Sequence, residues 1–116
     1  MTTREVGDRL VTLCRVGQND AAITELYADA VVSVEAQEPM REVHGIEAVR
    51  GKGAWWVENH EVHGAVVQGP FVNGDQFAVH FQFDVTPKAT GSRVTLDEIA
   101  LYTVADDKIV HEVFLY

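Results

Sequence analysis

The stretch that decides the fold is residues 76–86, QFAVHFQFDVT. Every second residue is large and apolar, so an extended chain puts Phe77, Val79, Phe81, Phe83 and Val85 on one face. Polar or small residues occupy the other face, which is typical of a half-buried strand. Turn sequences lie on both sides, at 73–75 (Asn-Gly-Asp) and at 87–91. We therefore expect hairpins before and after this strand.

The same period of two continues on both sides of this stretch. It predicts strands at 63–68, 92–105 and 108–116, the last two joined by a turn at 105–108. Strands that follow one another through short turns pair antiparallel. The second half of the chain is therefore predicted to be an antiparallel sheet.

The first half is helical in its pattern. Apolar residues recur every three or four positions in 4–16, and shorter patterns of the same kind predict helices at 19–28 and 45–60. The β-branched segment 31–36 predicts a strand, and the polar segment 37–42 with Pro39 predicts a loop at a pocket rim. Helices followed by a strand meander indicate one α+β domain over 1–116.

Composition narrows the classes of partner. The 116 residues contain 18 acidic and 9 basic side chains, for a net charge of −9, which repels nucleic acid and anionic membranes. Cys14 is the only cysteine, so no disulfide can form within the chain. There is no signal peptide pattern and no apolar run of membrane-spanning length, so we expect a cytoplasmic protein.

The last two strands are apolar on both faces. Ile99 and Leu101 face away from the helices, and so, by alternation, do Ile109, Val113 and Leu115. Three helices cannot cover both sides of the sheet. The pattern therefore predicts a homodimer through the outer sheet face, with His80 and Gln82 at its polar rim.

Two carboxylates share the inner face with apolar neighbours. Glu98 and Glu112 lie on adjacent strands, and burial on an apolar wall raises a carboxyl pKa toward the range of a general acid or base. In the alternative interpretation both lie at the wet edge of the sheet, paired with a cation; Arg41, Arg50 and Lys52 are the available partners. His60, at the end of the third helix, is a candidate proton shuttle or a helix cap.

Aromatic residues on the same side are predicted to line a pocket for a small hydrophobic ligand. They are Trp56, Phe81, Phe83 and Tyr102. His60 and His63 have H-x-x-H spacing but no third ligand nearby, so no metal is predicted. The chain also contains no phosphate loop or dinucleotide fingerprint, and no organic cofactor is predicted.

Three segments resemble a known family. They are LYADAVVSVEA (26–36), HGIEAVRGKGAWW (44–56) and DDKIVHEVFLY (106–116), and together they are similar to the SnoaL-like family of the nuclear transport factor two-like superfamily. The resemblance implies a cone-shaped α+β fold with a deep pocket, usually in a homodimer. The superfamily includes ketosteroid isomerase, together with binding domains that catalyse nothing.

The resemblance also implies one further candidate residue. The general base of ketosteroid isomerase matches Glu35, but its two oxyanion-hole groups fall on Val11 and Ala100, which cannot donate hydrogen bonds. Ketosteroid isomerase activity is therefore not expected. We expect an acid/base enzyme of the cyclase, isomerase or dehydratase kind using Glu35, Glu98 or Glu112 with His60. The alternative is a non-catalytic ligand-binding or protein-interaction domain.

Overall fold

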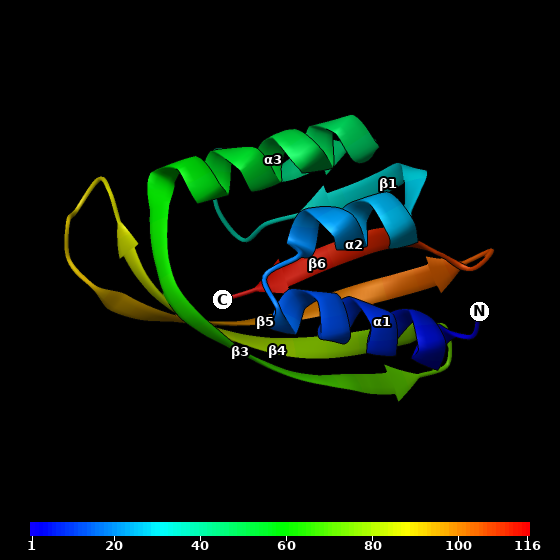
Figure 1. Ribbon diagram of the computed structural model, residues 1–116. Helices are drawn as coiled ribbons and strands as arrows, with labels where there is room; N and C mark the ends of the chain where they lie inside the picture. The colour runs from blue at the N-terminus through cyan, green and yellow to red at the C-terminus, as the bar shows by residue number, and fades with distance from the viewer.

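Three helices lie on one face of a six-stranded sheet in the computed structural model, which describes residues 1–116 (Figure 1). The elements are α1 (Thr3–Arg15), α2 (Asn19–Leu26), β1 (Tyr27–Val34), β2 (Glu42–His44), α3 (Ile46–Asn59), β3 (His60–Asn73), β4 (Gln76–Pro87), β5 (Val94–Ala105) and β6 (Lys108–Leu115). The strand order is β2-β1-β6-β5-β4-β3. The predicted α+β fold with a curved sheet is confirmed. None of the three helices combines the length and apolar character needed to cross a membrane.

The strands from β3 to β6 form an antiparallel meander, as predicted. β1 is different, because it pairs parallel with β6 on one side and antiparallel with the short β2 on the other. The last strand therefore lies in the middle of the sheet. This arrangement places side chains from both ends of the sequence next to one another on the inner face.

Several element boundaries differ from the prediction. β1 begins at Tyr27, so two residues predicted as helix, Tyr27 and Ala28, are extended. The short strand β2 occupies the end of the predicted rim loop. β3 extends beyond both predicted ends and contains Pro70. Proline has no backbone N–H to donate, and an edge strand tolerates it because its outer side has no neighbouring strand to pair with.

The outward orientation predicted for Ile109 is wrong. A β-bulge between Thr103 and Val104 in the β5–β6 register puts an extra residue into β6, so Val104 pairs with Ile109 while Thr103 pairs with His111. Ile109 is fully buried in the core as a result. The bulge reverses the alternation at this point and leaves Val113 and Leu115 on the outer face, as predicted.

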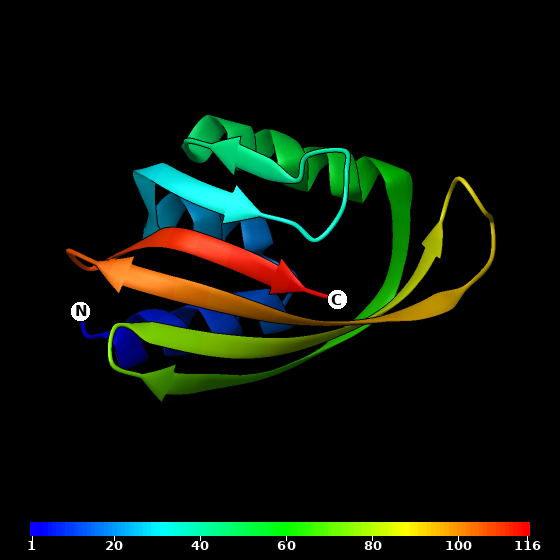
Figure 2. The ribbon, with the colours of Figure 1, turned by 180° about the vertical axis from the view of Figure 1, so that it is seen from behind.

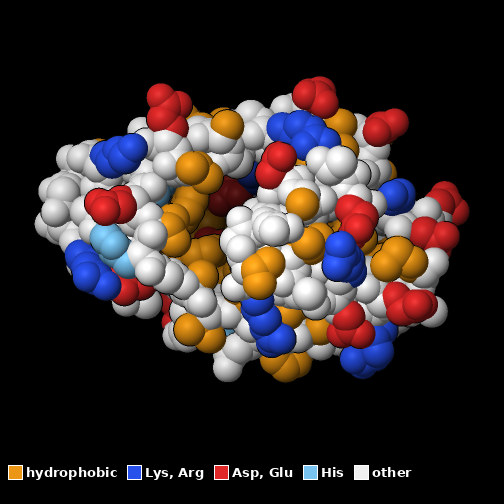
Figure 3. Space-filling view, in the orientation of Figure 1, with side chains coloured by type: hydrophobic (Ala, Val, Ile, Leu, Met, Phe, Trp, Pro, Cys, Tyr) orange, Lys and Arg blue, Asp and Glu red, His pale blue; other side chains and the backbone are white.

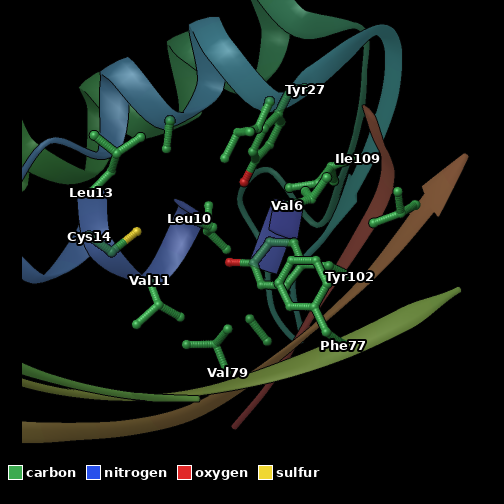
Figure 4. Close-up of a cluster of buried hydrophobic side chains, with 14 of the residues drawn as sticks. Val6, Leu10, Val11, Leu13, Cys14, Tyr27, Phe77, Val79, Tyr102 and Ile109 are labelled. Carbon is green, nitrogen blue, oxygen red and sulfur yellow. The ribbon is translucent and has the colours of Figure 1, made fainter. Parts of the chain in front are cut away.

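The core lies between α1 and the inner face of the sheet (Figure 4). Val6, Leu10 and Cys14 point from α1 toward the aromatic rings of Phe77 and Tyr102, which stack with centroids 4.8 Å apart. A capping box between Thr2 and Glu5 begins this helix. Burial raises the pKa of the Cys14 thiol to about 12, so this cysteine is an inert core residue.

No helix covers the other face of the sheet (Figure 2). Ile99 and Leu115 are exposed there, with 38% and 53% of their surface accessible. Leu101 and Val113 lie beside them and are half-buried. The inner face therefore holds the core and the outer face carries an apolar surface.

Two glycines allow the packing of α1 to be tested. A Cβ at Gly7 would lie 2.8 Å from Cβ of Pro70, whereas a Cβ at Gly51, inside α3, would meet no atom within 4 Å. We predict that Gly7→Ala lowers the free energy of unfolding by about 1–3 kcal/mol through overpacking. The matched control Gly51→Ala should raise it by roughly 1 kcal/mol, because alanine is the better helix former. Urea unfolding of both variants measures the difference, and equal effects would contradict the close approach of α1 and β3.

Candidate acid/base site

The three predicted carboxylates converge on the inner side of the sheet. Glu35 follows the end of β1, Glu112 lies in the middle of β6 and Glu98 lies in β5. The charges of Glu35 and Glu112 both act on the Glu98 carboxyl, together with that of Lys52 on α3. Four groups from four elements therefore share one site.

Glu112 is a buried carboxyl whose two oxygens both accept hydrogen bonds. Only 2% of the residue is exposed. The Tyr27 hydroxyl donates to Oε1, and the Ser33 hydroxyl donates to Oε2 at 2.6 Å. The parallel register places Ser33 directly beside Glu112. Burial raises the pKa of Glu112, and the two donors act against that rise.

Glu35 is held from two sides. Lys52 Nζ lies 2.7 Å from Oε2, and the Tyr116 hydroxyl donates to Oε1 at 3.0 Å. The same ammonium donates to Ser33 and lies 4.9 Å from the centre of the Phe114 ring. Lys52 therefore connects the Glu35 carboxylate with the hydroxyl that holds Glu112.

Glu98 is the exception, because its carboxyl makes no hydrogen bond or ion pair in the structure. It stands opposite Phe81 in the β4–β5 register, on an apolar wall. Desolvation, followed by the charge of Glu35, raises the pKa of Glu98 from about 4.5 to about 7, while Lys52 acts in the opposite direction. This side chain can exchange a proton with a bound molecule near neutral pH.

Three aromatic rings and one imidazole form a continuous wall beside Glu98. Phe81 stacks on Phe83 at 5.6 Å, Phe83 contacts Trp56 at 5.3 Å, and Trp56 stacks on His60 at 4.4 Å between ring centres. His60 Nδ1 lies 2.8 Å from the Trp56 carbonyl oxygen and so carries the hydrogen of that bond, which leaves Nε2 free. His60 makes no hydrogen bond to a carboxylate. Its predicted role as a proton shuttle stays a prediction.

The molecular surface has a hollow below α3 in the view of Figure 3, with hydrophobic side chains around its opening and acidic atoms at its bottom. Two further concavities lie elsewhere. One of about 640 Å³ is bordered by Val34 and residues 38–42, and one of about 360 Å³ lies on the outer face at the bend of the sheet. Neither contains a residue predicted for the site. No group of three or more His, Cys, Asp or Glu side chains is arranged to hold a metal ion.

Two predicted pocket residues are deeper than expected. Tyr102 is 2% exposed and Phe81 is 3% exposed, and Tyr102 stacks on Phe77 in the core. Both are part of the packed wall behind the hollow. Trp56 and Phe83 are more exposed and lie nearer the surface.

Sequence reasoning missed four residues of the network. The sequence pattern predicts Tyr27 in a helix and indicates no role for Ser33 or Tyr116. The sequence suggests Lys52 as a partner of Glu98 or Glu112, but in the structure it pairs with Glu35. The predicted strand 31–36 contains the one signal, a polar Ser33 among β-branched residues. Its link to Glu112 follows only from the parallel pairing of β1 with β6.

The raised pKa of Glu98 predicts how the stability of the fold depends on pH. A carboxyl whose pKa is higher in the folded protein than in the unfolded chain stabilises the fold at low pH, and this contribution is lost as pH rises through the folded value. Between about pH 4.5 and 7 the loss amounts to roughly 3 kcal/mol, because one pKa unit corresponds to about 1.4 kcal/mol. Glu98→Gln should therefore unfold at higher urea concentration than the wild type at pH 8. At pH 4 the two should be nearly equal, and a constant difference across this range would contradict the elevated pKa.

Comparisons with known proteins agree with this architecture. The family model described as SnoaL-like domain matches residues 1–116. The structure of a candidate SnoaL-like polyketide cyclase from Mesorhizobium loti, also labelled carbohydrate phosphatase, is 55% identical, with a TM-score of 0.97 and complete coverage of both chains. A search of functionally curated proteins finds no match.

More distant structures share the fold alone. A protein with a cystatin-like fold from Xanthomonas campestris is 16% identical, with a TM-score of 0.81 over 99% of this chain and 90% of the other. A protein with a ketosteroid isomerase-like fold from Catenulispora acidiphila, solved with trimethylamine, is 17% identical, with a TM-score of 0.74 over 92% of this chain and 81% of the other. With a family match along its whole length and this architecture, the chain belongs to the SnoaL-like domain family.

Proposed function

We propose that this chain is a proton-transfer enzyme for a small, largely apolar molecule, of the cyclase, isomerase or dehydratase kind, with Glu98 as its acid/base group. The observation that carries the proposal is the contrast among the three carboxylates. Glu35 and Glu112 are occupied by internal partners, while Glu98 has none and stands against an aromatic wall. A carboxyl with a pKa near 7 has both protonation states available at neutral pH, which general acid/base catalysis requires.

The surroundings of Glu98 favour an uncharged substrate. The only cation of the site, Lys52, is already paired with Glu35, so a phosphate or carboxylate on a ligand would face carboxyl groups without a free counter-charge. The aromatic wall offers apolar contact instead. The polyketide cyclase description of the Mesorhizobium loti relative is compatible with such a substrate, whereas the phosphatase label is not supported by these charges.

A model ketone tests the proposed proton transfer. We expect the wild-type protein to accelerate exchange of the α-hydrogens of 2-tetralone for deuterium in D₂O at pH 7, measured by mass spectrometry. Glu98→Gln should reduce the rate by about 10²-fold or more, because a general base contributes 10²–10⁴. Asp97→Asn is the matched control, since Asp97 lies next in sequence but pairs with His80 on the outer face; its rate should equal the wild type.

The alternative function is a non-catalytic ligand-binding domain. The aromatic wall favours it independently of Glu98, because apolar rings can bind a small apolar molecule whether or not a proton is transferred. The fluorescence of Trp56 in this wall provides the binding assay. Quenching by 2-tetralone without any deuterium exchange above buffer would support the binding domain and contradict the enzyme. A wild-type rate in Glu98→Gln would assign the exchange to another group.

We also propose that the outer sheet face joins two copies of the chain. An apolar row crosses five strands there, since each residue is the register partner of the next: Phe71, Ala78, Leu101, Val113 and Val34. Phe71 is 62% exposed at the end of the row. A two-fold axis brings the same row of both subunits together, and the second copy buries apolar side chains that water would otherwise contact.

Sedimentation tests the dimer. We expect a mass near twice 12.8 kDa at micromolar concentration, and a shift toward monomer for Leu101→Glu, which would place two like charges near the two-fold axis. Thr95→Glu adds the same charge to β5 outside the row and should leave the dimer intact. A wild-type protein that sediments as a monomer would contradict the proposal.

A further inference from the structure

The centre of α3 has little apolar packing against the sheet. Val49 is the only buried residue of this 14-residue helix, whereas α1 buries six. Gly51 and Gly53 flank Lys52, and neither is required by packing, because a Cβ at either position would meet no atom within 4 Å. Each glycine weakens the helix by about 1 kcal/mol relative to alanine. Between Val49 and Trp56, apolar packing therefore contributes little to holding α3 in place.

Lys52 connects the centre of α3 to the sheet through polar contacts. Its side chain is 12% exposed, and its ammonium reaches three residues on two strands: Glu35 and Ser33 at β1, and the ring of Phe114 on β6. Charge-assisted hydrogen bonds of this kind are stronger than neutral ones, particularly away from water. The lysine thus extends from the helix to the floor of the site.

The partners of Lys52 include one carboxylate directly and a second through one hydroxyl. Glu35 accepts from the ammonium at 2.7 Å, and Ser33 accepts from it while donating to Glu112. Without the ammonium, Glu35 would lose its counter-charge and Ser33 would lose a donor. Both carboxyl groups beside Glu98 therefore depend on one side chain of α3.

We propose that Lys52 is the positioning residue of the site: it ties α3 over the hollow and holds Glu35 and Ser33–Glu112 so that Glu98 alone is free to exchange a proton. Its importance for proton transfer rests on the function proposed above. Its effect on Glu98 and on α3 does not, because both can be measured without a substrate. The groups whose charges act on Glu98 are Glu35 beyond β1, Lys52 on α3 and Glu112 on β6.

Titration of Glu98 by carboxyl ¹³C NMR, assigned with Glu98→Gln, tests the electrostatic part. Lys52→Met should raise the midpoint by about one pH unit, or tenfold in proton affinity, because the attractive charge is removed. Lys52→Arg keeps the positive charge and should leave the midpoint at the wild-type value. Glu35→Gln should lower the midpoint, because it removes a repelling charge while Lys52 remains. A general structural disturbance would not shift the Glu98 midpoint in opposite directions in Lys52→Met and Glu35→Gln.

Amide hydrogen exchange tests the tie to α3. The amides of residues 50–59 should exchange at least tenfold faster in Lys52→Met than in the wild type or Lys52→Arg, while those of α1 stay unchanged. Unchanged α3 exchange, or midpoints of Lys52→Met and Glu35→Gln that move in the same direction, would overturn the proposal. If Lys52→Met does not fold, Lys52→Arg and Glu35→Gln still decide it: an Arg variant with a shifted midpoint, or a Gln variant with a raised one, would overturn it. Failure of the 2-tetralone exchange would count against the proposed enzyme and leave these results standing.

Discussion

A carboxyl group buried in the centre of the sheet is the constraint on which the rest of this structure depends. Burying Glu112 without partners would cost several kcal/mol, so its two oxygens must be satisfied within the fold. Tyr27 and Ser33, the donors, come from β1, at the opposite end of the sequence. They are correctly placed only when β1 pairs with β6 in the observed parallel register. The polar network and the strand order therefore require each other.

The same network separates the roles of chemically identical groups. Glu112 is fully hydrogen-bonded and inaccessible, Glu35 is neutralised by Lys52, and Glu98 is left without a partner in an apolar setting. Environment, not residue type, therefore determines which carboxyl can exchange protons near pH 7. A site built this way needs no unusual residue, because each environment follows from the position of a strand.

Much of this could be predicted from the alternation of side chains. The pattern in 76–86 gave the inner face of β4 correctly, and the positions of Glu98 and Glu112 followed from the same rule in the next strands. The rule failed at Ile109, because a bulge inserts one residue without any glycine or proline to mark it. It also could not reveal Tyr27 and Ser33 as partners of Glu112, since pairing between distant strands leaves no local pattern. Lys52 was visible in the sequence, but its choice of Glu35 depends on where α3 lies.

The central position of β6 has a consequence for how the chain folds. Ser33 and Glu112 are separated by 79 residues, and every other strand precedes β6 in the chain. Until β6 inserts, β1 and β5 both present open edges with unpaired backbone groups, which are templates for wrong pairing. Closing so long a loop is slow, because its entropy is lost before the contacts form. Folding can begin in the local hairpins formed by β3, β4 and β5, but the sheet is complete only when β6 has inserted. Truncation of the C-terminal end, or slow insertion of β6, would therefore leave an aggregation-prone intermediate.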